Sequence, residues 1–371
     1  MQITQITLQN YRNYKKEKIS FSPFLNIIVG RNAQGKTNLL EAIYLACLTK
    51  SLRTTKDKDL IYFGQNQSRV KINLQKSFGE QLIEINLFKN QKKNIKINDL
   101  TVLRVGDLLG SLQAVYFCPD ELKLIKDSPE NRRRFLDISI SQANKSYFYT
   151  LLRFEKILAQ RNKLLKAAIT FEEIKPSLSI LTHQLIEESH KIIYERRRFI
   201  ENLKSPLQKT HSFLTNNQEQ IEISYQSIPG ETKEEIRENL IKELQKNEDK
   251  EFKERCTQAG PHRDDFKIIC HCCADSESQP IDLRHFGSQG QQRTATLSLK
   301  LSKLIILEEQ CGEKPILLLD DVLSELDHTR RQKLLEIAGS YQTVLTATDV
   351  PPNLPKNTNI IKIQNGEVIN Q

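Results

Sequence analysis

Hydrophobic and polar positions alternate through much of the first hundred residues, which is the pattern of strands that bury one face. The first forty residues read as two or three such strands, and residues 68–98 alternate again in three segments that predict an antiparallel sheet. Between these regions, residues 37–48 carry apolar side chains at helical spacing. The pattern therefore predicts strands arranged around one helix.

The periodicity becomes helical from about residue 142 to residue 204. Two apolar stripes in this region are separated by Lys175-Pro176, and because proline interrupts a helix, we expect a helical hairpin that turns there. A further helix is expected from residue 233 to about residue 252. Ile221–Tyr225 predicts a short strand whose domain the pattern leaves open.

After residue 255 the pattern of an α/β protein returns. Residues 316–319 are wholly apolar, as expected of a central parallel strand, and Val344-Leu345 suggests another. Residues 360–369 predict a hairpin around an Asn-Gly turn.

We therefore expect one α/β domain formed by both ends of the sequence, with an α-helical lobe inserted between them. The expected boundaries, which are approximate, are residues 1–140 plus 255–371 for the α/β domain and residues 141–254 for the helical lobe.

A complete G-x-x-x-x-G-K-[ST] loop lies between the buried strand at residues 25–29 and the helix at residues 37–48. Its glycines let several backbone N–H groups converge on one phosphate, and the helix adds the positive end of its dipole. Lys36 is expected to reach the outer phosphates, and Thr37 to offer a hydroxyl to Mg²⁺. The candidate ATP-binding residues are Gly30, Arg31, Asn32, Ala33, Gln34, Gly35, Lys36 and Thr37.

Two adjacent carboxylates follow the apolar strand at residues 316–319. We expect Asp320 to hold Mg²⁺ through water, and Asp321 to polarise the water that attacks the γ-phosphate. Lys36 and Asp321 are therefore the candidate catalytic residues, and Thr37 and Asp320 the candidate metal site.

A second anion site is predicted where small residues and amides precede the apolar helix that contains Leu297 and Leu301. One chain needs only one γ-phosphate site, so the second most simply serves the nucleotide of a partner. Its residues are Ser288, Gln289, Gly290 and Gln291.

The net charge of the chain indicates an acidic partner. Lysine and arginine number 55 against 46 aspartate and glutamate, which gives a formal net charge of +9. Nucleic acid is the commonest partner of such a chain. The basic stretches Lys50–Lys58, Lys92-Lys93 and Arg196–Arg198 are candidates for DNA contact, and each also fits an ordinary solvated surface.

The sequence indicates a cytoplasmic protein with no membrane partner, because no segment has the apolar length of a membrane span and the first residues lack signal-peptide features. Seven cysteines, an odd and scattered set, fit a reducing compartment. The cluster Cys270–Cys273 invites a zinc site, but no second pair lies at ligand spacing, so we expect no metal there.

Several further motifs are distributed over essentially the whole chain. They are Leu8–Tyr14, Pro119–Glu121, Ser128-Pro129, Arg132–Asp137, Gly260–Asp265, Ser288–Thr294 and Ser324–Asp327. Together with the phosphate loop, they resemble the ATP-binding-cassette ATPases found in structural-maintenance (SMC) and double-strand-break repair proteins. Within that class, the chain is similar to the RecF family of bacterial recombination proteins.

This resemblance implies an α/β fold, an ABC-type P-loop ATPase head with a mixed sheet, an antiparallel β subdomain and the inserted helical lobe. It makes Ser288–Gln291 a signature motif that contacts the nucleotide of the other subunit in trans, and it makes Ser324 and Asp327 part of a D-loop at the same seam. ATP and Mg²⁺ are the implied cofactors, and an ATP-dependent homodimer the implied assembly.

The implied function is DNA repair, replication restart and the SOS response to DNA damage. The dimer would bind gapped or duplex DNA and, with RecO and RecR, promote RecA loading on single-stranded DNA, while a weak DNA-stimulated ATPase resets it. The alternatives are an ATP-regulated scaffold without meaningful turnover and another SMC-like ATPase.

Three departures and one unplaced residue limit what the resemblance carries over. Asp127 stands where the family pattern usually has glycine, so we expect the turn before Ser128-Pro129 to differ. Asp321 stands where most cassette ATPases have glutamate, and the shorter acid is consistent with slow hydrolysis. Thr348 stands where transporters place a switch histidine. Gln113 lies near the region of the usual Mg²⁺-sensing glutamine, and no role is assigned to it.

Overall fold

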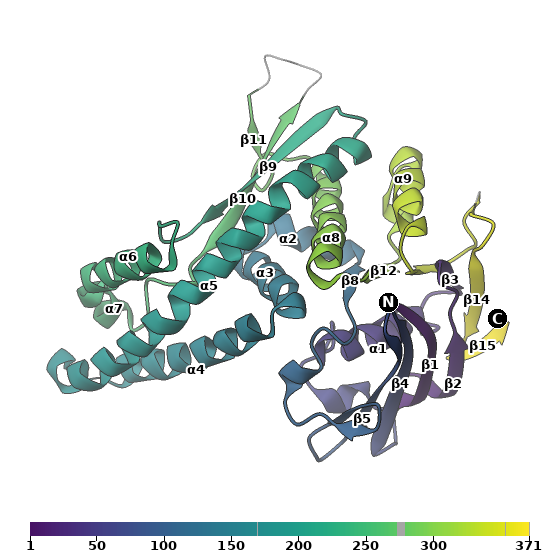
Figure 1. The fold of residues 1–371 in the computed structure, drawn as a ribbon, viewed down its shortest axis with the longest axis horizontal. Helices are drawn as coiled ribbons and strands as arrows, with labels where there is room; N and C mark the ends of the chain where they lie inside the picture. The colour runs from purple at the N-terminus through teal and green to yellow at the C-terminus, as the bar shows by residue number, and fades with distance from the viewer. Residues whose placement is uncertain (169, 273–278, 353, 371) are drawn as a thin grey trace. The chain divides into compact units, whose positions relative to one another are not determined.

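The computed structural model describes residues 1–168, 170–272, 279–352 and 354–370, which form two compact units (Figure 1). Helices α5 and α8 contribute residues to both units. The first unit comprises Met1–Glu121, Ser212–Asn217 and Thr296–Gln371, and the second comprises Leu122–His211 and Gln218–Ala295.

An antiparallel sheet occupies the early part of the first unit, as the alternating pattern predicts. Its strands have the spatial order β2-β1-β4-β5-β6-β7, and β2, β1 and β4 are seen side by side in Figure 1. Strand β4 buries every second residue over most of its length, which explains why the sequence signal is clear. The strands are β1 (Gln2–Tyr11), β2 (Tyr14–Ser20), β4 (Gln67–Lys76), β5 (Gly79–Phe88), β6 (Asn94–Ile97) and β7 (Leu100–Thr101).

A second, mainly parallel sheet of the first unit has the order β15-β14-β3-β13-β12-β8. Only β15 runs antiparallel, because it closes the predicted hairpin with β14. Segments from both ends of the sequence pair in this sheet. The strands are β3 (Leu25–Val29), β8 (Ala114–Phe117), β12 (Ile316–Asp320), β13 (Thr343–Ala347), β14 (Asn359–Gln364) and β15 (Glu367–Asn370).

Helix α1 (Lys36–Leu48) contacts strands of both sheets. Ten of its 13 residues are buried, so it is apolar on nearly all sides and has little amphipathic character. The unit is completed by α9 (His328–Gly339) and by the short 3-10 helices η1 (Asp57–Leu60), η2 (Val105–Asp107), η3 (Pro119–Leu122) and η4 (Leu323–Glu325). The main core of the unit therefore surrounds α1, whose first residue belongs to the phosphate loop.

The second unit combines helices with a three-stranded antiparallel sheet of order β11-β10-β9. The predicted strand at Ile221–Tyr225 is the centre of β9. The strands are β9 (Glu219–Gln226), β10 (Asp265–Cys272) and β11 (Ile281–Asp282). The helices are α2 (Lys123–Lys126), α3 (Pro129–Ala143), α4 (Lys145–Ala167), α5 (Phe171–Leu214), α6 (Lys233–Lys246), α7 (Glu248–Glu254) and the start of α8 (Gln289–Cys311).

The helical hairpin is present, but its predicted turn at Lys175-Pro176 is wrong. Helix α4 ends at Ala167, α5 begins at Phe171, and Pro176 lies inside α5. A buried cluster formed by Leu165, Ala168, Ile174 and Leu178 packs the two helices against each other, with residues on both sides of the proline. Tertiary packing therefore outweighs the local helix-breaking preference. The single helix predicted at residues 233–252 is in fact α6 and α7, divided at Asn247.

The predicted domain boundaries at residues 141 and 254 both fall inside the second compact unit. The reason is that α3 contacts α4 and β10, which joins residues before and after the helical segment. The assignment of functional domains to these parts stays a prediction.

Candidate nucleotide-binding site

The phosphate loop connects β3 to α1 through two residues in the left-handed region, Ala33 (φ 64°) and Gly35 (φ 113°). Gly35 is required for a second reason, because a Cβ there would lie 2.6 Å from Asn13 Nδ2. Arg31, Asn32 and Ala33 are exposed on the loop. The local sequence thus builds a tight turn whose outer side is open to a ligand.

Two other segments hold the loop in place. Asn13 Nδ2 donates to the carbonyl oxygen of Gln34 at 2.9 Å, and the Tyr14 hydroxyl donates to that of Gly35 at 2.9 Å. From the β14–β15 turn, the backbone N–H of Gly366 also donates to Gln34, at 3.0 Å. Reasoning from the residues alone missed these supports. Their only signal was that Asn13 and Tyr14 belong to the motif Leu8–Tyr14.

The ammonium group of Lys36 lies inside the loop. It donates to the carbonyl oxygen of Gly30 and, at 3.1 Å, to that of Arg31. Burial lowers the pKa of Lys36, while Asp321 and Asp320 oppose that shift. A cation held by carbonyl oxygens beside two carboxylates is placed to exchange those partners for an entering anion.

The carboxylate of Asp320 gathers groups from three other elements at one edge of the parallel sheet. Its Oδ1 accepts from Thr37 Oγ1 at 3.0 Å and from Thr346 Oγ1 at 2.7 Å. Its Oδ2 accepts from the Tyr116 hydroxyl at 2.9 Å. Burial, with Asp320 as the nearest charge, raises the pKa of Tyr116, so the phenol stays a donor. Thr37 and Asp320, which are 283 positions apart, thus come into direct contact.

Asp321 has an unusual backbone for a non-glycine residue, with φ 52°. Thr346 Oγ1 accepts from its backbone N–H at 2.9 Å, and Ser324 Oγ donates to its carbonyl oxygen at 2.8 Å. Such a conformation costs about 1–3 kcal/mol and persists where the surroundings fix it. The threonine that touches both carboxylate residues is Thr346, whereas Thr348, singled out in the sequence, is exposed.

The donor set of Thr37 and Asp320 fits Mg²⁺. Hard cations of this kind take oxygen ligands at 2.0–2.1 Å in octahedral geometry, which places neighbouring ligand oxygens about 3.0 Å apart. Thr37 Oγ1 and Asp320 Oδ1 are 3.0 Å apart. The pair therefore satisfies both the chemistry and the spacing of such an ion, or of its bound water.

These groups line an open cleft of about 1130 Å³ in the first unit. The phosphate loop, Asp320 and Asp321 form one part of its wall, and Arg12, Arg53, Lys58 and Phe63 contribute another. Arg12 is fixed there by a two-pronged ion pair with Glu41 at 2.8 and 2.9 Å. The cleft is large enough for a nucleoside triphosphate and carries cations, a metal-binding pair and apolar surface.

The predicted second anion site begins α8 with a reciprocal cap. Ser288 Oγ accepts from the backbone N–H of Gln291 at 3.2 Å, and Gln291 Oε1 accepts from that of Ser288 at 2.9 Å. Ser288, Gln289 and Gly290 are exposed, so the first turn of the helix is open to an anion.

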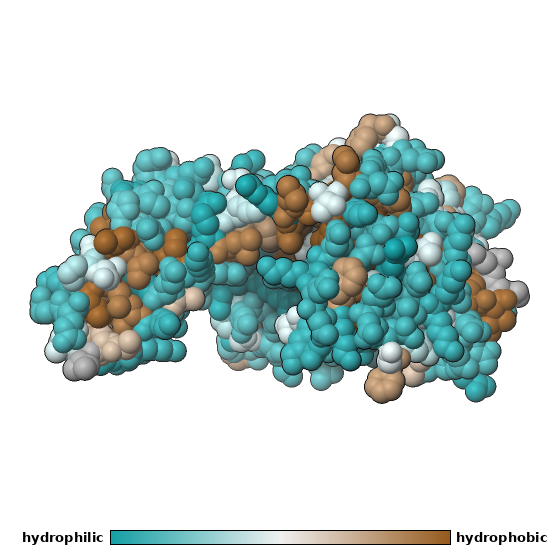
Figure 2. Space-filling view, turned by 90° about the horizontal axis from the view of Figure 1, so that it is seen from below, coloured by the Kyte–Doolittle hydropathy of each residue, from teal (hydrophilic) through white to brown (hydrophobic). Residues whose placement is uncertain are grey.

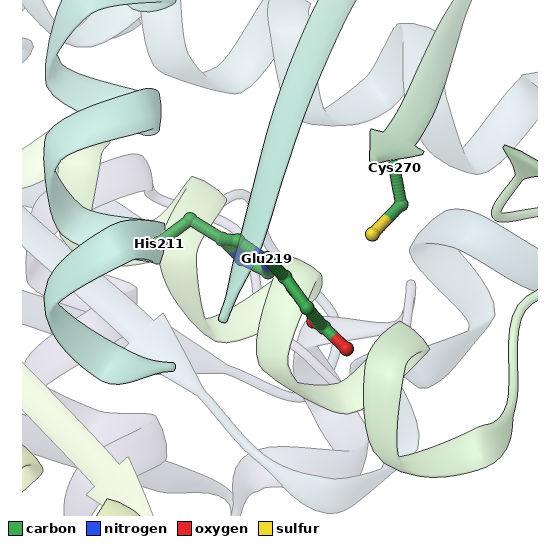
Figure 3. A group of neighbouring side chains, drawn as sticks. All are labelled: His211, Glu219 and Cys270. Carbon is green, nitrogen blue, oxygen red and sulfur yellow. The ribbon is translucent and has the colours of Figure 1, made fainter. Parts of the chain in front are cut away.

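The Gln291 side chain contacts a small polar group of the second unit, whose members His211, Glu219 and Cys270 are drawn in Figure 3. Its Nε2 lies 3.1 Å from Glu219 Oε1, and Glu219 Oε2 lies 3.3 Å from His211 Nε2. The Cys270 thiol lies within 4.8 Å of both the histidine nitrogen and the carboxylate. Of the cysteine cluster considered from the sequence, Cys273 lies outside the described residues.

Comparison with known proteins agrees with these observations. A family model described as the RecF/RecN/SMC N terminal domain matches residues 2–348. A DNA replication and repair protein RecF from Clostridium perfringens is 39% identical over 371 residues, covering 99% of each chain. One from Acetivibrio thermocellus is 42% identical over 357 residues, covering 94% of each. The chain belongs to the RecF family.

Solved structures show the same relationship. A recombination mediator protein RecF with ATP, described as part of the RecFOR pathway, is 38% identical with a TM-score of 0.88, covering 99% of this chain and 96% of that one. An Smc head domain from Pyrococcus furiosus has a TM-score of 0.58 at 16% identity, covering 99% and 94%, and shows likeness of fold alone. The expected fold class, an ABC-type ATPase head of the RecF and SMC kind, is confirmed.

In this RecF-family chain, the two D-loop candidates have clear local contacts. Asp327 caps α9 by accepting from the backbone N–H of Arg330 at 2.9 Å, and it pairs with the Arg330 guanidinium at 2.6 Å. That backbone hydrogen bond is the main reason why the pKa of Asp327 is lowered. Ser324 supports Asp321, as described above. Both residues therefore stabilise the segment that follows the carboxylate pair.

Several RecF-family motif residues prove to be structural. Arg132 forms a two-pronged pair with Asp265 at 2.5 and 2.9 Å, and its side chain is 3% exposed. Arg263 donates to the Thr257 carbonyl oxygen at 3.0 Å rather than pairing with its neighbour Asp264. Arg196, the first residue of a proposed DNA-contact stretch, is 2% exposed and cannot reach DNA.

Gln113 can be excluded from the nucleotide site by topology. It precedes β8, which runs parallel to β12, so it lies at the amino edge of the sheet. Asp320 ends β12 at the opposite, carboxyl edge. Gln113 is buried and donates to Cys311 Sγ at 2.5 Å.

Three further observations concern membrane spans, the polarity of the surface and the cysteines. No helix within the described ranges is both long and apolar enough for a membrane span. The face in Figure 2 is mainly hydrophilic, with hydrophobic residues in separate small groups. The six cysteines among the residues that the structure describes are all free thiols.

Proposed function

We propose that the protein is an ATP-dependent DNA-binding protein of recombinational repair and replication restart. The observation that carries this proposal is the contact of Thr37 with Asp320 beside Lys36, because these residues from two distant segments would hold a nucleotide and its Mg²⁺. Membership of the RecF family, and the ATP-bound RecF structure among the similar proteins, support ATP as the nucleotide.

At this site, the loop N–H groups and Lys36 would bind the β- and γ-phosphates, and Thr37 and Asp320 would hold Mg²⁺. The ion, when bound, neutralises charge on the phosphates. Asp321 would orient the attacking water, and its short side chain favours slow turnover. ATP would then act mainly as a switch, with weak, DNA-stimulated hydrolysis as its reset.

The switch would be a homodimer in which Ser288–Gln291 of each subunit closes over the nucleotide of the other. The exposed first turn of α8 supports this role, because it presents N–H groups and a hydroxyl at a helix N-terminus. Ser324 and Asp327 would form the D-loop at the same seam.

The positive net charge and the family support DNA as the partner of this dimer. The similar RecF structures are described as belonging to the RecFOR pathway. We infer that this protein binds gapped or duplex DNA and acts with RecO and RecR to promote RecA loading on single-stranded DNA.

Sedimentation without nucleotide, with ADP and with a non-hydrolysable ATP analogue tests the switch. Dimers are expected only with the analogue, and Ser288→Arg should abolish them by filling the anion site. Ser288→Thr keeps the capping hydroxyl and is the matched control, which should still dimerise. A wild-type protein that stays monomeric with the analogue would contradict the proposal.

ATP hydrolysis with and without duplex DNA distinguishes a switch from a scaffold. We expect slow turnover that rises with DNA and is lost in Lys36→Arg, since arginine does not fit the loop that holds the lysine. Turnover that is absent in the wild type, with dimerisation intact, would favour the ATP-regulated scaffold.

A further inference from the structure

Two basic stretches that are separate in the sequence are joined in the first unit by Lys93. Its Nζ donates to the carbonyl oxygen of Thr49, at the end of α1, and pairs with Asp57 at 3.1 Å. Helix η1, which contains Asp57, also contacts β5. The segment 50–58 and the turn 89–93 after β5 therefore form one continuous surface, although some 40 positions separate them.

This surface is rich in cations that protein carboxylates do not neutralise. Within the part of the chain that the structure describes, the only ion pair in these two segments is that of Lys93 with Asp57. The other nearby acid, Asp59, accepts from the Thr54 hydroxyl at 2.7 Å. The exposed basic residues, which we call the composite basic surface, are Lys50, Arg53, Lys56, Lys58, Lys89 and Lys92.

We propose that the composite basic surface binds the sugar-phosphate backbone of duplex DNA. This inference rests on the proposed function, and it names where the DNA lies. Exposed lysines and arginines on loops suit phosphate contacts, which are independent of base sequence. The surface carries no helix long enough to enter a groove, since η1 has four residues.

The position of this surface also links DNA to the nucleotide. Arg53 and Lys58 belong both to the composite basic surface and to the wall of the nucleotide cleft. DNA phosphates on one side and nucleotide phosphates on the other therefore face the same short segment. A nucleotide that fixes this segment orders the DNA-binding cations as well, which gives a physical route for ATP-dependent DNA binding.

Two residues of the third basic stretch, which lies in the second unit, are held by protein groups. Arg196 is buried and its guanidinium is committed to Asp137, so no DNA contact is available to it. Arg197 donates to the carbonyl oxygen of Ile228 at 2.7 Å. Arg198 is the one exposed residue of that stretch, so the proposal places the DNA contact on the two stretches of the first unit.

The test compares two triple variants of the full chain in the presence of a non-hydrolysable ATP analogue. The first, Lys50→Gln, Lys56→Gln and Lys92→Gln, removes three of the six cations of the surface without touching residues that line the cleft. The matched control, Lys15→Gln, Lys16→Gln and Lys18→Gln, removes the same charge from exposed positions on β2. Binding of a fluorescent duplex is titrated at several salt concentrations.

The first variant should bind duplex at least about tenfold more weakly, and its plot of log affinity against log salt should be shallower by between about 1 and 2.7, at about 0.9 per lost phosphate contact. The control should change affinity less than about threefold. A third variant with arginine at positions 50, 56 and 92 should bind as the wild type does.

Equal losses in the two glutamine variants, or an unchanged salt slope in the first, would overturn the assignment of this surface while leaving the proposed function intact. Wild-type protein that dimerises with the analogue yet binds no DNA would instead refute the DNA-binding function itself. Sedimentation of each variant with the analogue shows that dimerisation is retained, and a first variant that binds no DNA because it no longer dimerises would also count against the proposal.

Discussion

The nucleotide cleft and the polar network around Arg196 contain the same types of charged residue, but only those of the cleft are available to a ligand. In the cleft, Lys36 is held by backbone carbonyl oxygens and Asp320 by hydroxyls, so both charges keep partners that a ligand can replace. In the network, Arg196 donates to both oxygens of Asp137 and to the Pro261 carbonyl oxygen. Because Arg196 is also buried, a ligand has no access to it.

The other charged groups of the network are also paired with protein groups. The Tyr225 hydroxyl donates to Asp264 Oδ2 at 2.5 Å, and Arg133 donates to the Asp264 carbonyl oxygen at 2.8 Å. Burial raises the pKa of Asp264 to about 6, against the pull of Arg196. The comparison teaches that a charged residue can bind a ligand where a ligand can replace its partners, and is structural where it cannot. The sequence alone does not reveal which partners such a residue has.

Breaking the network should have the largest effect. Arg196→Ala should lower the free energy of unfolding by about 3–5 kcal/mol, because it takes the cation away from the partly buried carboxylate of Asp137 and the buried carboxylate of Asp264. Urea denaturation measures this. Arg198→Ala, two positions along and exposed, is the control and should change stability by less than about 0.5 kcal/mol. An Arg196 variant as stable as the wild type would remove the contrast between the two regions.

The cleft should behave in the opposite way. Lys36→Ala should reduce ATP turnover by about a hundredfold or more, because it removes the charge that stabilises the transferred phosphate. The same change should alter the free energy of unfolding by less than about 1 kcal/mol. The reason is that Lys36 donates to backbone carbonyl oxygens, so its removal leaves no buried carboxylate unpaired. Turnover assays and urea denaturation of the same preparation measure the two effects. A large loss of stability would show that Lys36 has a structural role.

A pH dependence distinguishes a neutral buried group beside the network. His262 Nε2 donates to the Thr257 carbonyl oxygen at 3.0 Å, and burial lowers the pKa of His262 to about 4. Because the folded pKa lies below the unfolded one, the stabilisation is present above about pH 6.5 and is lost as pH falls toward 4. Stability should fall by about 2 kcal/mol more between pH 7.5 and 5 than in His262→Gln.

Urea denaturation at both pH values measures that difference, with His285→Gln at an exposed position as control. Identical pH profiles for wild type and His262→Gln would show that the imidazole is not held neutral by the fold.

The smallest effect concerns the support of the signature segment. Glu219→Ala should weaken analogue-dependent dimers by about tenfold, because Gln291 loses an anchor that accepts its amide. ATP affinity of the monomer should stay unchanged. Glu222→Ala, an exposed neighbour on β9, should do neither. If both glutamate variants dimerise equally well, the anchoring of Gln291 has no role in association.

The sequence by itself determined the features that depend on local spacing. The phosphate loop, the strand ending at Asp320 and the alternation of β4 are local patterns, because their backbone geometry follows from glycine, burial and period. The reciprocal cap of Ser288 and Gln291 is equally local, since both residues lie in one helical turn.

Only the tertiary structure decided which distant groups meet. The contact of Thr37 with Asp320, the choice of Thr346 over Thr348, and the joining of residues 50–58 to Lys93 depend on strand order and loop packing. Pro176 inside α5 shows the same limit, because burial of Ile174 and Leu178 outweighs a local preference. Contacts between distant segments depend on the whole core, and no local pattern encodes them.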